Sequence, residues 1–225
     1  MLALAASRFF GRQPETIVAV TGTNGKTSVA TFTRQIWQAL GHKAISLGTM
    51  GVQGDYVAKL AHTTPEPVTL HRVLSEAAAS GVTHAAMEAS SHGLDQRRLD
   101  GVNVAAGAFT NFSQDHLDFH PTMHDYFEAK AQLFAQGPST RAVRSVICVD
   151  DEWGRRMAEL ARRLTAAGWT ELAEVDRWSL APGDRRFVVR GGSPEEARAR
   201  AFSIAASSWP ASSWSATSGL AAMRR

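Results

Sequence analysis

The fold of this chain is decided by the stretch Val18-Ala19-Val20-Thr21-Gly22-Thr23-Asn24-Gly25-Lys26-Thr27. It places an apolar strand, a glycine-bearing turn, a lysine and a hydroxyl directly before a helical pattern. Closely spaced glycines let backbone N–H groups converge on an anion, and the helix N-terminus and the lysine add favourable charge. The stretch therefore predicts a nucleotide phosphate site, in which Thr27 offers its hydroxyl to magnesium.

This stretch departs from the common phosphate-loop pattern, because Val20 stands where the first glycine would be. It is therefore either a distinct subclass of phosphate loop or a Gly-Lys-Thr turn without function. The context favours the first. Residues 17–20 are typical of a buried parallel strand, and helical spacing follows in Val29, Phe32, Ile36 and Leu40.

Composition narrows the class of protein. The 225 residues carry a formal charge of +3, and the segment from Glu152 onward holds 12 arginines against 8 acidic residues. No basic cluster there alternates with aromatic residues, so we expect no nucleic-acid binding. No run of about 18 apolar residues indicates a membrane span. The single cysteine, Cys148, excludes an internal disulfide and favours the cytoplasm.

Strand and helix patterns alternate along the chain, which predicts an α/β fold: a three-layer P-loop-type domain whose mainly parallel sheet is flanked by helices. We expect Thr69 and Thr122 to cap helices, the latter with Asp125 as capping-box partner. The expected strands are 17–20, 44–47, 82–87, 104–110 and 145–149. The expected helices are 27–40, 69–80, 123–135 and 152–164.

The two ends of the chain differ from this central part. Residues 1–14 are interpreted as a lead-in and 15–164 as one ATP-binding domain. Residues 165–225 hold four of the six tryptophans and no clean period, so we expect an irregular tail. A shifted reading frame and a divergent or disordered terminus both explain this composition.

Further polar residues follow the predicted strands. Glu88 suits a magnesium ligand, although local backbone donors could also satisfy it. The segment 109–120 is densest in metal and phosphate ligands. Residues 62–67 form a hydroxyl-rich loop that alone is ordinary turn chemistry. Lys130 lies on the apolar face of its helix, where it either keeps its charge in water or, with a pKa lowered by burial, reacts with CO₂ to give a carbamate.

Six ordered motifs resemble the central, ATP-binding domain of the Mur ligase superfamily. Within it they are most similar to the ligases that add the third peptide residue, 2,6-diaminopimelate or L-lysine, to UDP-MurNAc-L-Ala-D-Glu. The resemblance covers about residues 1–163, and the family's own loop has the shorter form. The motifs are Thr21-Gly22-Thr23-Asn24-Gly25-Lys26-Thr27, His62-Thr63-Thr64-Pro65, Met87-Glu88-Ala89-Ser90-Ser91-His92-Gly93-Leu94, Phe109-Thr110-Asn111, Asp115-His116-Leu117-Asp118-Phe119-His120 and Glu128-Ala129-Lys130.

The resemblance implies a role for each matched residue. Thr27 would bind one magnesium, and Glu88, His116 and a carbamylated Lys130 would hold a second, which makes Lys26, His116 and Lys130 the catalytic candidates. ATP would be bound by Gly22, Thr23, Asn24, Gly25, Lys26, Thr27 and Ser28, with Asn111 supporting the loop. The UDP-MurNAc-dipeptide would contact His62, Thr63, Thr64, Ser90, Gln96 and Arg98.

The resemblance also implies an activity: an ATP-dependent amide ligase of peptidoglycan precursor synthesis, cytoplasmic and monomeric. Such a ligase makes an acyl phosphate from the substrate carboxylate and ATP, which the amino group of the incoming amino acid attacks. Because the family carries a preceding and a following domain, we expect this chain to be a truncated ATP-binding core. Two alternatives stay open: a catalytically inactive nucleotide-binding fragment, and a related ligase such as folylpolyglutamate or cyanophycin synthetase.

Overall fold

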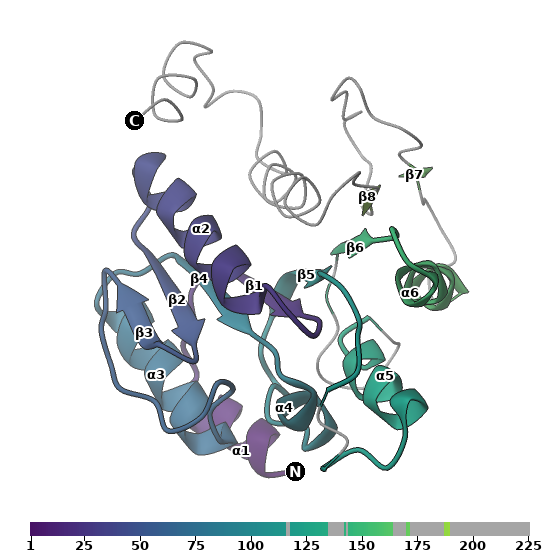
Figure 1. Cartoon of the computed structure of the whole chain (residues 1–225). Helices are drawn as coiled ribbons and strands as arrows, with labels where there is room; N and C mark the ends of the chain where they lie inside the picture. The colour runs from purple at the N-terminus through teal and green to yellow at the C-terminus, as the bar shows by residue number, and fades with distance from the viewer. Residues whose placement is uncertain (116–117, 135–141, 143, 164–169, 172–186, 190–225) are drawn as a thin grey trace.

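A computed structural model describes residues 1–115, 118–134, 142, 144–163, 170–171 and 187–189 (Figure 1). The helices are α1 (Leu2–Phe10), α2 (Lys26–Ala39), α3 (Pro67–Ala79), α4 (Ser91–Asp95), α5 (Met123–Ala131) and α6 (Glu152–Arg163). The strands are β1 (Thr16–Thr21), β2 (Ala44–Gly48), β3 (Gly51–Gly54), β4 (His84–Glu88), β5 (Val104–Phe109), β6 (Arg144–Cys148), β7 (Thr170–Glu171) and β8 (Phe187–Val189). In these ranges no helix combines the length and the apolar character needed to cross a membrane.

The described strands form one sheet in the order β3-β2-β4-β1-β5-β6-β8-β7. Only the pair of β2 with β3 is antiparallel among them, and the other six pairs are parallel. The prediction of an α/β fold with a mainly parallel sheet is therefore confirmed. All nine helices and strands predicted from the sequence occur, with ends that differ by a few residues.

Strand β4 shows how the sheet divides the core into two layers. Ala86 packs in a cluster with Ala30 and Trp37 of α2. Ala85 and Met87, which alternate with Ala86 along the strand, belong to the larger cluster that contains the inner face of α3. Helix α2 therefore covers one face of the sheet and α3 the other (Figure 1). Burial on both faces agrees with the three apolar residues in the middle of this strand, Ala85, Ala86 and Met87.

The predicted start of α3 is wrong. Thr69 lies inside the helix, which begins at Pro67 with Glu66 as its N-cap. Proline suits the first helical position because its φ is already helical and no N–H is needed there. The predicted cap of α5 is confirmed, since the Thr122 hydroxyl accepts from the Asp125 N–H. In place of a return bond from the Asp125 carboxylate to the backbone, the Thr122 hydroxyl donates to that carboxylate at 2.7 Å.

Several elements were not expected. α1 lies in the segment interpreted as a lead-in and packs beside α3, where the Ser75 hydroxyl donates to the carbonyl of Phe10 at 3.2 Å. β3 and α4 also add to the predicted set. β7 and β8 fall in the segment expected to be an irregular tail. The other residues of 165–225, with the interpretation as a shifted reading frame, lie outside the described residues.

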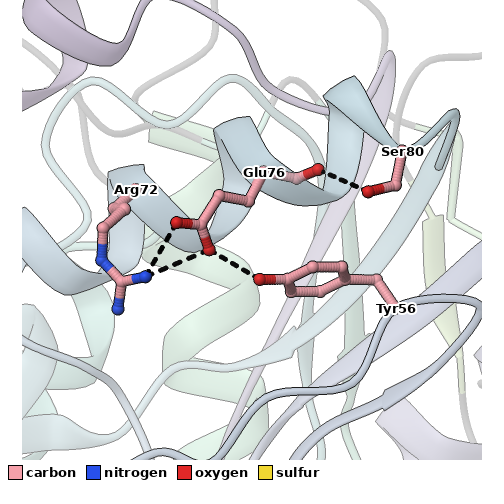
Figure 2. Close-up of polar contacts among 4 residues, drawn as sticks. All are labelled: Tyr56, Arg72, Glu76 and Ser80. Carbon is pink, nitrogen blue, oxygen red and sulfur yellow. Dashed lines mark hydrogen bonds and ion pairs between the residues drawn. The ribbon is translucent and has the colours of Figure 1, made fainter.

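The connection from β3 to α3 is tied down by side chains on α3 (Figure 2). The Tyr56 hydroxyl donates to the Glu76 carboxylate at 2.6 Å, and Arg72 donates to both oxygens of that carboxylate at 2.9 and 3.1 Å. The Ser80 hydroxyl donates to the Glu76 carbonyl at 2.9 Å. This network fixes the start of the connection whose other end carries the hydroxyl-rich loop.

Candidate active site

Three neighbouring strands end at one edge of the sheet. In the parallel register Val20 of β1 pairs with Glu88 of β4, and Thr21 pairs with Phe109 of β5. The loop after β1 therefore lies between Glu88 and the segment that follows Phe109. Ligands in open sheets of this kind bind beyond the carboxyl ends of the strands.

The segment after β5 holds the phosphate loop in shape. The Asn111 amide accepts from the Asn24 N–H at 2.9 Å and donates to the Asn24 carbonyl at 3.1 Å. The Thr110 hydroxyl donates to the same carbonyl at 2.7 Å. Gly22 has φ 138°, and a Cβ there would overlap the Thr110 hydroxyl oxygen. Only glycine therefore fits at Gly22.

Lys26 is the first residue of α2 and turns back onto the loop. Its Nζ donates to the carbonyl oxygens of Gly22 at 3.0 Å and Thr23 at 2.7 Å. Burial lowers the pKa of Lys26, while the charges of Glu88 and Asp115 act in the opposite direction. The ammonium group therefore lies against the carbonyl oxygens of the loop that follows β1. Ser28 follows on the exposed side of the first turn.

Glu88 is 2% exposed and faces Thr27 across the start of α2. One carboxylate oxygen accepts from the Thr27 hydroxyl at 3.0 Å, and the other accepts from the Thr49 N–H at 3.0 Å. A carboxylate and a hydroxyl side by side are oxygen donors of the kind that magnesium prefers. Thr27 and Glu88 therefore fit a magnesium ion. The alternative, that a local backbone donor satisfies Glu88, is also met, by the Thr49 N–H.

Lys130 is buried, with 1% of its surface exposed, so the interpretation that it keeps its charge in water is wrong. Its Nζ donates to the Gly22 carbonyl at 2.9 Å. Burial chiefly, and then the charge of Lys26, lowers the pKa of Lys130 to about 6, against the raising effect of Asp115. The amine is therefore largely neutral at neutral pH, which is the form that reacts with CO₂.

The proposed second magnesium set is only partly described. His116 lies outside the described residues. Within the residues that are described, no three histidine, cysteine, aspartate or glutamate side chains are grouped to hold a metal. The joint role of Glu88, His116 and Lys130 stays a prediction.

The predicted substrate residues are brought together around Glu88 and α4. The Thr64 hydroxyl donates to the Glu88 carbonyl at 2.9 Å and accepts from Ser90, whose own hydroxyl caps α4. Arg98 donates to the Thr64 carbonyl at 2.7 Å and to the Gln96 side chain at 2.7 and 3.0 Å. Thr64 and Ser90 thus have structural bonds in addition to any ligand contact.

The other two substrate candidates lie nearer the surface of the same loop. Thr63 bonds the Thr49 hydroxyl at 3.0 Å. His62 is exposed. Both side chains are therefore accessible to a ligand at this edge.

Sequence reasoning missed three contributors to the site: Thr49, Thr110 and Tyr126. Thr49 donates to Glu88 through its backbone N–H, which no side-chain pattern reveals. Thr110 directly precedes Asn111 in a motif that was noted. Tyr126 was seen only as an apolar neighbour of Lys130, but its hydroxyl lies 3.3 Å from the Thr23 hydroxyl. The i to i+4 spacing of Tyr126 and Lys130 was the available signal.

With this geometry in place, comparison with known proteins identifies the family. The family model of the Mur ligase middle domain matches residues 20–174. The chain belongs to the Mur ligase family. The phosphate loop, Glu88 and Lys130 all lie within the matched residues. The candidate site therefore belongs to the domain that the family model describes.

Relatives and solved structures agree with this assignment. The chain is 57% identical over 165 residues to a UDP-N-acetylmuramoyl-L-alanyl-D-glutamate--2,6-diaminopimelate ligase of Agrobacterium fabrum, covering 72% of this chain and 33% of that protein. It is 61% identical over 136 residues to the ligase of the same name from Bradyrhizobium diazoefficiens, covering 60% and 28%. The chain thus spans about a third of the length of these curated relatives.

A solved structure of a ligase of that name matches with a TM-score of 0.66 at 29% identity, over 85% of this chain and 35% of the other. Escherichia coli FolC in complex with DHPP and ADP matches with a TM-score of 0.52 at 17% identity, over 85% and 46%. The second likeness shows a shared fold only.

Proposed function

We propose that this chain is the ATP-binding core of a ligase that adds 2,6-diaminopimelate to UDP-MurNAc-L-Ala-D-Glu in peptidoglycan precursor synthesis. The observation that carries the proposal is the convergence of Lys26, Thr27, Glu88 and Lys130 on one phosphate loop. The relatives named for this reaction, at 57% and 61% identity, support the choice of substrate. The proposed location is the cytoplasm, and the proposed state is a monomer.

Each residue has a distinct task in the proposed reaction. The backbone N–H groups of the loop and Lys26 bind phosphate oxygens and offset their charge. Thr27 and Glu88 hold magnesium, which when bound supplies further positive charge to the phosphates. The UDP-linked dipeptide contacts Thr63 and the surface around α4, so that its carboxylate faces the terminal phosphate. Acyl phosphate formation then depends on position and electrostatics.

Lys130 is proposed to be carbamylated in the assembled site. Its neutral amine nitrogen attacks the carbon of CO₂. One C–O π bond opens as the N–C bond forms, and the nitrogen passes a proton to water, which leaves an anionic carbamate. The lowered pKa and the burial of the side chain support this step. Intact mass spectrometry under CO₂ should show the addition of one CO₂, and Lys130→Met should abolish it.

A direct test separates the proposal from its alternatives. Calorimetry with a non-hydrolysable ATP analogue and magnesium measures the nucleotide site. An assay of amide formation with UDP-MurNAc-dipeptide and diaminopimelate, or with a folate and glutamate, identifies the substrates. Binding without amide formation would favour an inactive nucleotide-binding fragment. Absence of nucleotide binding would contradict the proposed function.

A further inference from the structure

Helix α5 contacts the phosphate loop through two side chains one turn apart. Lys130 donates to the Gly22 carbonyl at 2.9 Å, and the Tyr126 hydroxyl lies 3.3 Å from the Thr23 hydroxyl oxygen. Both side chains are buried, with 1% and 0% of their surfaces exposed. Two consecutive loop residues, Gly22 and Thr23, are therefore hydrogen-bonded to α5.

The direction of the Tyr126 bond follows from the partners of Thr23. The single hydroxyl proton of Thr23 is directed to the Ser113 carbonyl at 3.1 Å, and its oxygen also accepts from the Ser113 N–H at 3.0 Å. Tyr126 is then the donor and fills the second lone pair of the Thr23 oxygen. Burial raises the pKa of Tyr126, which keeps the phenol protonated as a donor.

The ring of Tyr126 has a second contact. The Nζ of Lys130 lies over the ring, 4.3 Å from its centroid. The ring itself is packed against Phe112 and His120, at centroid distances of 4.9 and 5.3 Å. Tyr126 therefore offers a fixed aromatic face to the amine and a fixed donor to the loop.

We propose that Tyr126 is a positioning residue of the nucleotide site: it holds Lys130 and the Gly22–Thr23 peptide in the geometry that receives phosphate. The inference rests on the proposed function, because it assumes that nucleotide is the ligand of the loop. A loop that hydrogen bonds hold in one conformation loses less conformational freedom when a ligand binds. Removal of the Tyr126 bond should therefore weaken ligand binding.

The test uses the full chain and three variants. Tyr126→Phe keeps the ring and removes the donor, whereas Tyr126→Leu removes both. The matched control is Tyr56→Phe, which removes the hydroxyl of the chain's other tyrosine at its bond with Glu76 on α3. Calorimetry gives the Kd of a non-hydrolysable ATP analogue with magnesium. NMR of the Lys130 ε-methylene protons reports the ring through its ring-current shift.

We expect Tyr126→Phe to raise Kd about fivefold, the effect of one lost hydrogen bond, and to keep the ring-current shift. Tyr126→Leu should raise Kd more and abolish the shift, while Tyr56→Phe should change neither. Unchanged Kd in folded Tyr126→Phe and Tyr126→Leu would overturn the role of Tyr126 and leave the proposed function intact. Wild-type protein that binds no nucleotide would overturn both. Thermal melting shows which variants are folded.

Discussion

Lys26 and Lys130 donate to the same acceptor, the carbonyl oxygen of Gly22, at 3.0 and 2.9 Å. One amine comes from the helix that follows the loop and the other from α5, more than a hundred residues later in the chain. Burial is the chief cause of the lowered pKa of Lys130, and the nearby charge of Lys26 lowers it further because two like charges disfavour each other. An anion bound at the loop would favour the protonated form of both amines.

The first prediction concerns Lys130 and pH. Its folded-state pKa of about 6 lies below the ordinary value of 10.5, so between these values the unfolded chain holds more protons and stability rises with pH. Lys130→Met should remove this dependence and raise the free energy of unfolding at neutral pH by on the order of 5 kcal/mol. This gain in the free energy of unfolding should become smaller as the pH rises toward the ordinary lysine pKa of 10.5.

Denaturant titrations in CO₂-free buffer across this pH range measure the effect. Lys59→Met, at an exposed lysine, is the control. Equal pH dependence in wild type and Lys130→Met would show that Lys130 is not the group responsible.

The second prediction concerns magnesium. Glu88→Gln keeps the shape of the side chain but removes its charge, so the gain in nucleotide affinity on adding magnesium should fall about tenfold or more. Affinity measured in EDTA should change little. The comparison is Glu15→Gln, an exposed glutamate just before β1. A magnesium effect that survives in Glu88→Gln would remove Glu88 from the site.

The third prediction concerns Gly48. A Cβ at this position would overlap the Glu88 carboxylate, so Gly48→Ala should destabilise the fold by about 1–3 kcal/mol. In a Glu88→Ala background the overlap is gone, and the same substitution should cost clearly less. A double-mutant cycle by denaturant titration gives both values. Additive effects would mean that the two side chains do not meet.

The fourth prediction concerns His84 at the other end of β4. Burial chiefly, with the charge of His42, lowers its pKa from 6.5 to about 4. As the pH falls, His84 is protonated in the unfolded chain before it is protonated in the folded chain. The contribution of neutral His84 to the free energy of unfolding is therefore complete above pH 6.5 and is lost as the pH falls toward 4. The loss should reach about 2 kcal/mol by pH 5.

His84→Gln tests this directly, because it should flatten the fall in stability over this interval. Melting temperatures at neutral pH and near pH 5 provide the measurement. A wild-type profile that falls no more steeply than that of His84→Gln would contradict the assignment.

The main helices and strands could be predicted from local sequence patterns. The other elements and the contacts within the site depend on residues that are distant in the sequence. The strand, loop and helix around Lys26 could be predicted because the apolar strand, the two glycines and the lysine stand within a dozen residues and all indicate the same structure. β3 could not, since the sequence of Gly51–Gly54 has one apolar residue and the strand forms by pairing with β2. α1 buries only Ala3 and Ala6, which give no clear period. The contact of Tyr126 with Thr23 joins residues remote in sequence, and no local pattern encodes it.

The register of β4 limits how this protein can vary in length. Glu88 and His84 lie on the same side of the strand because they are four positions apart, an even number, and side chains alternate between the two faces. One residue inserted between them would turn Glu88 away from Thr27 and into the layer of α3. Natural insertions and deletions should therefore collect in the turn before β4, around Gly81, and spare the strand itself.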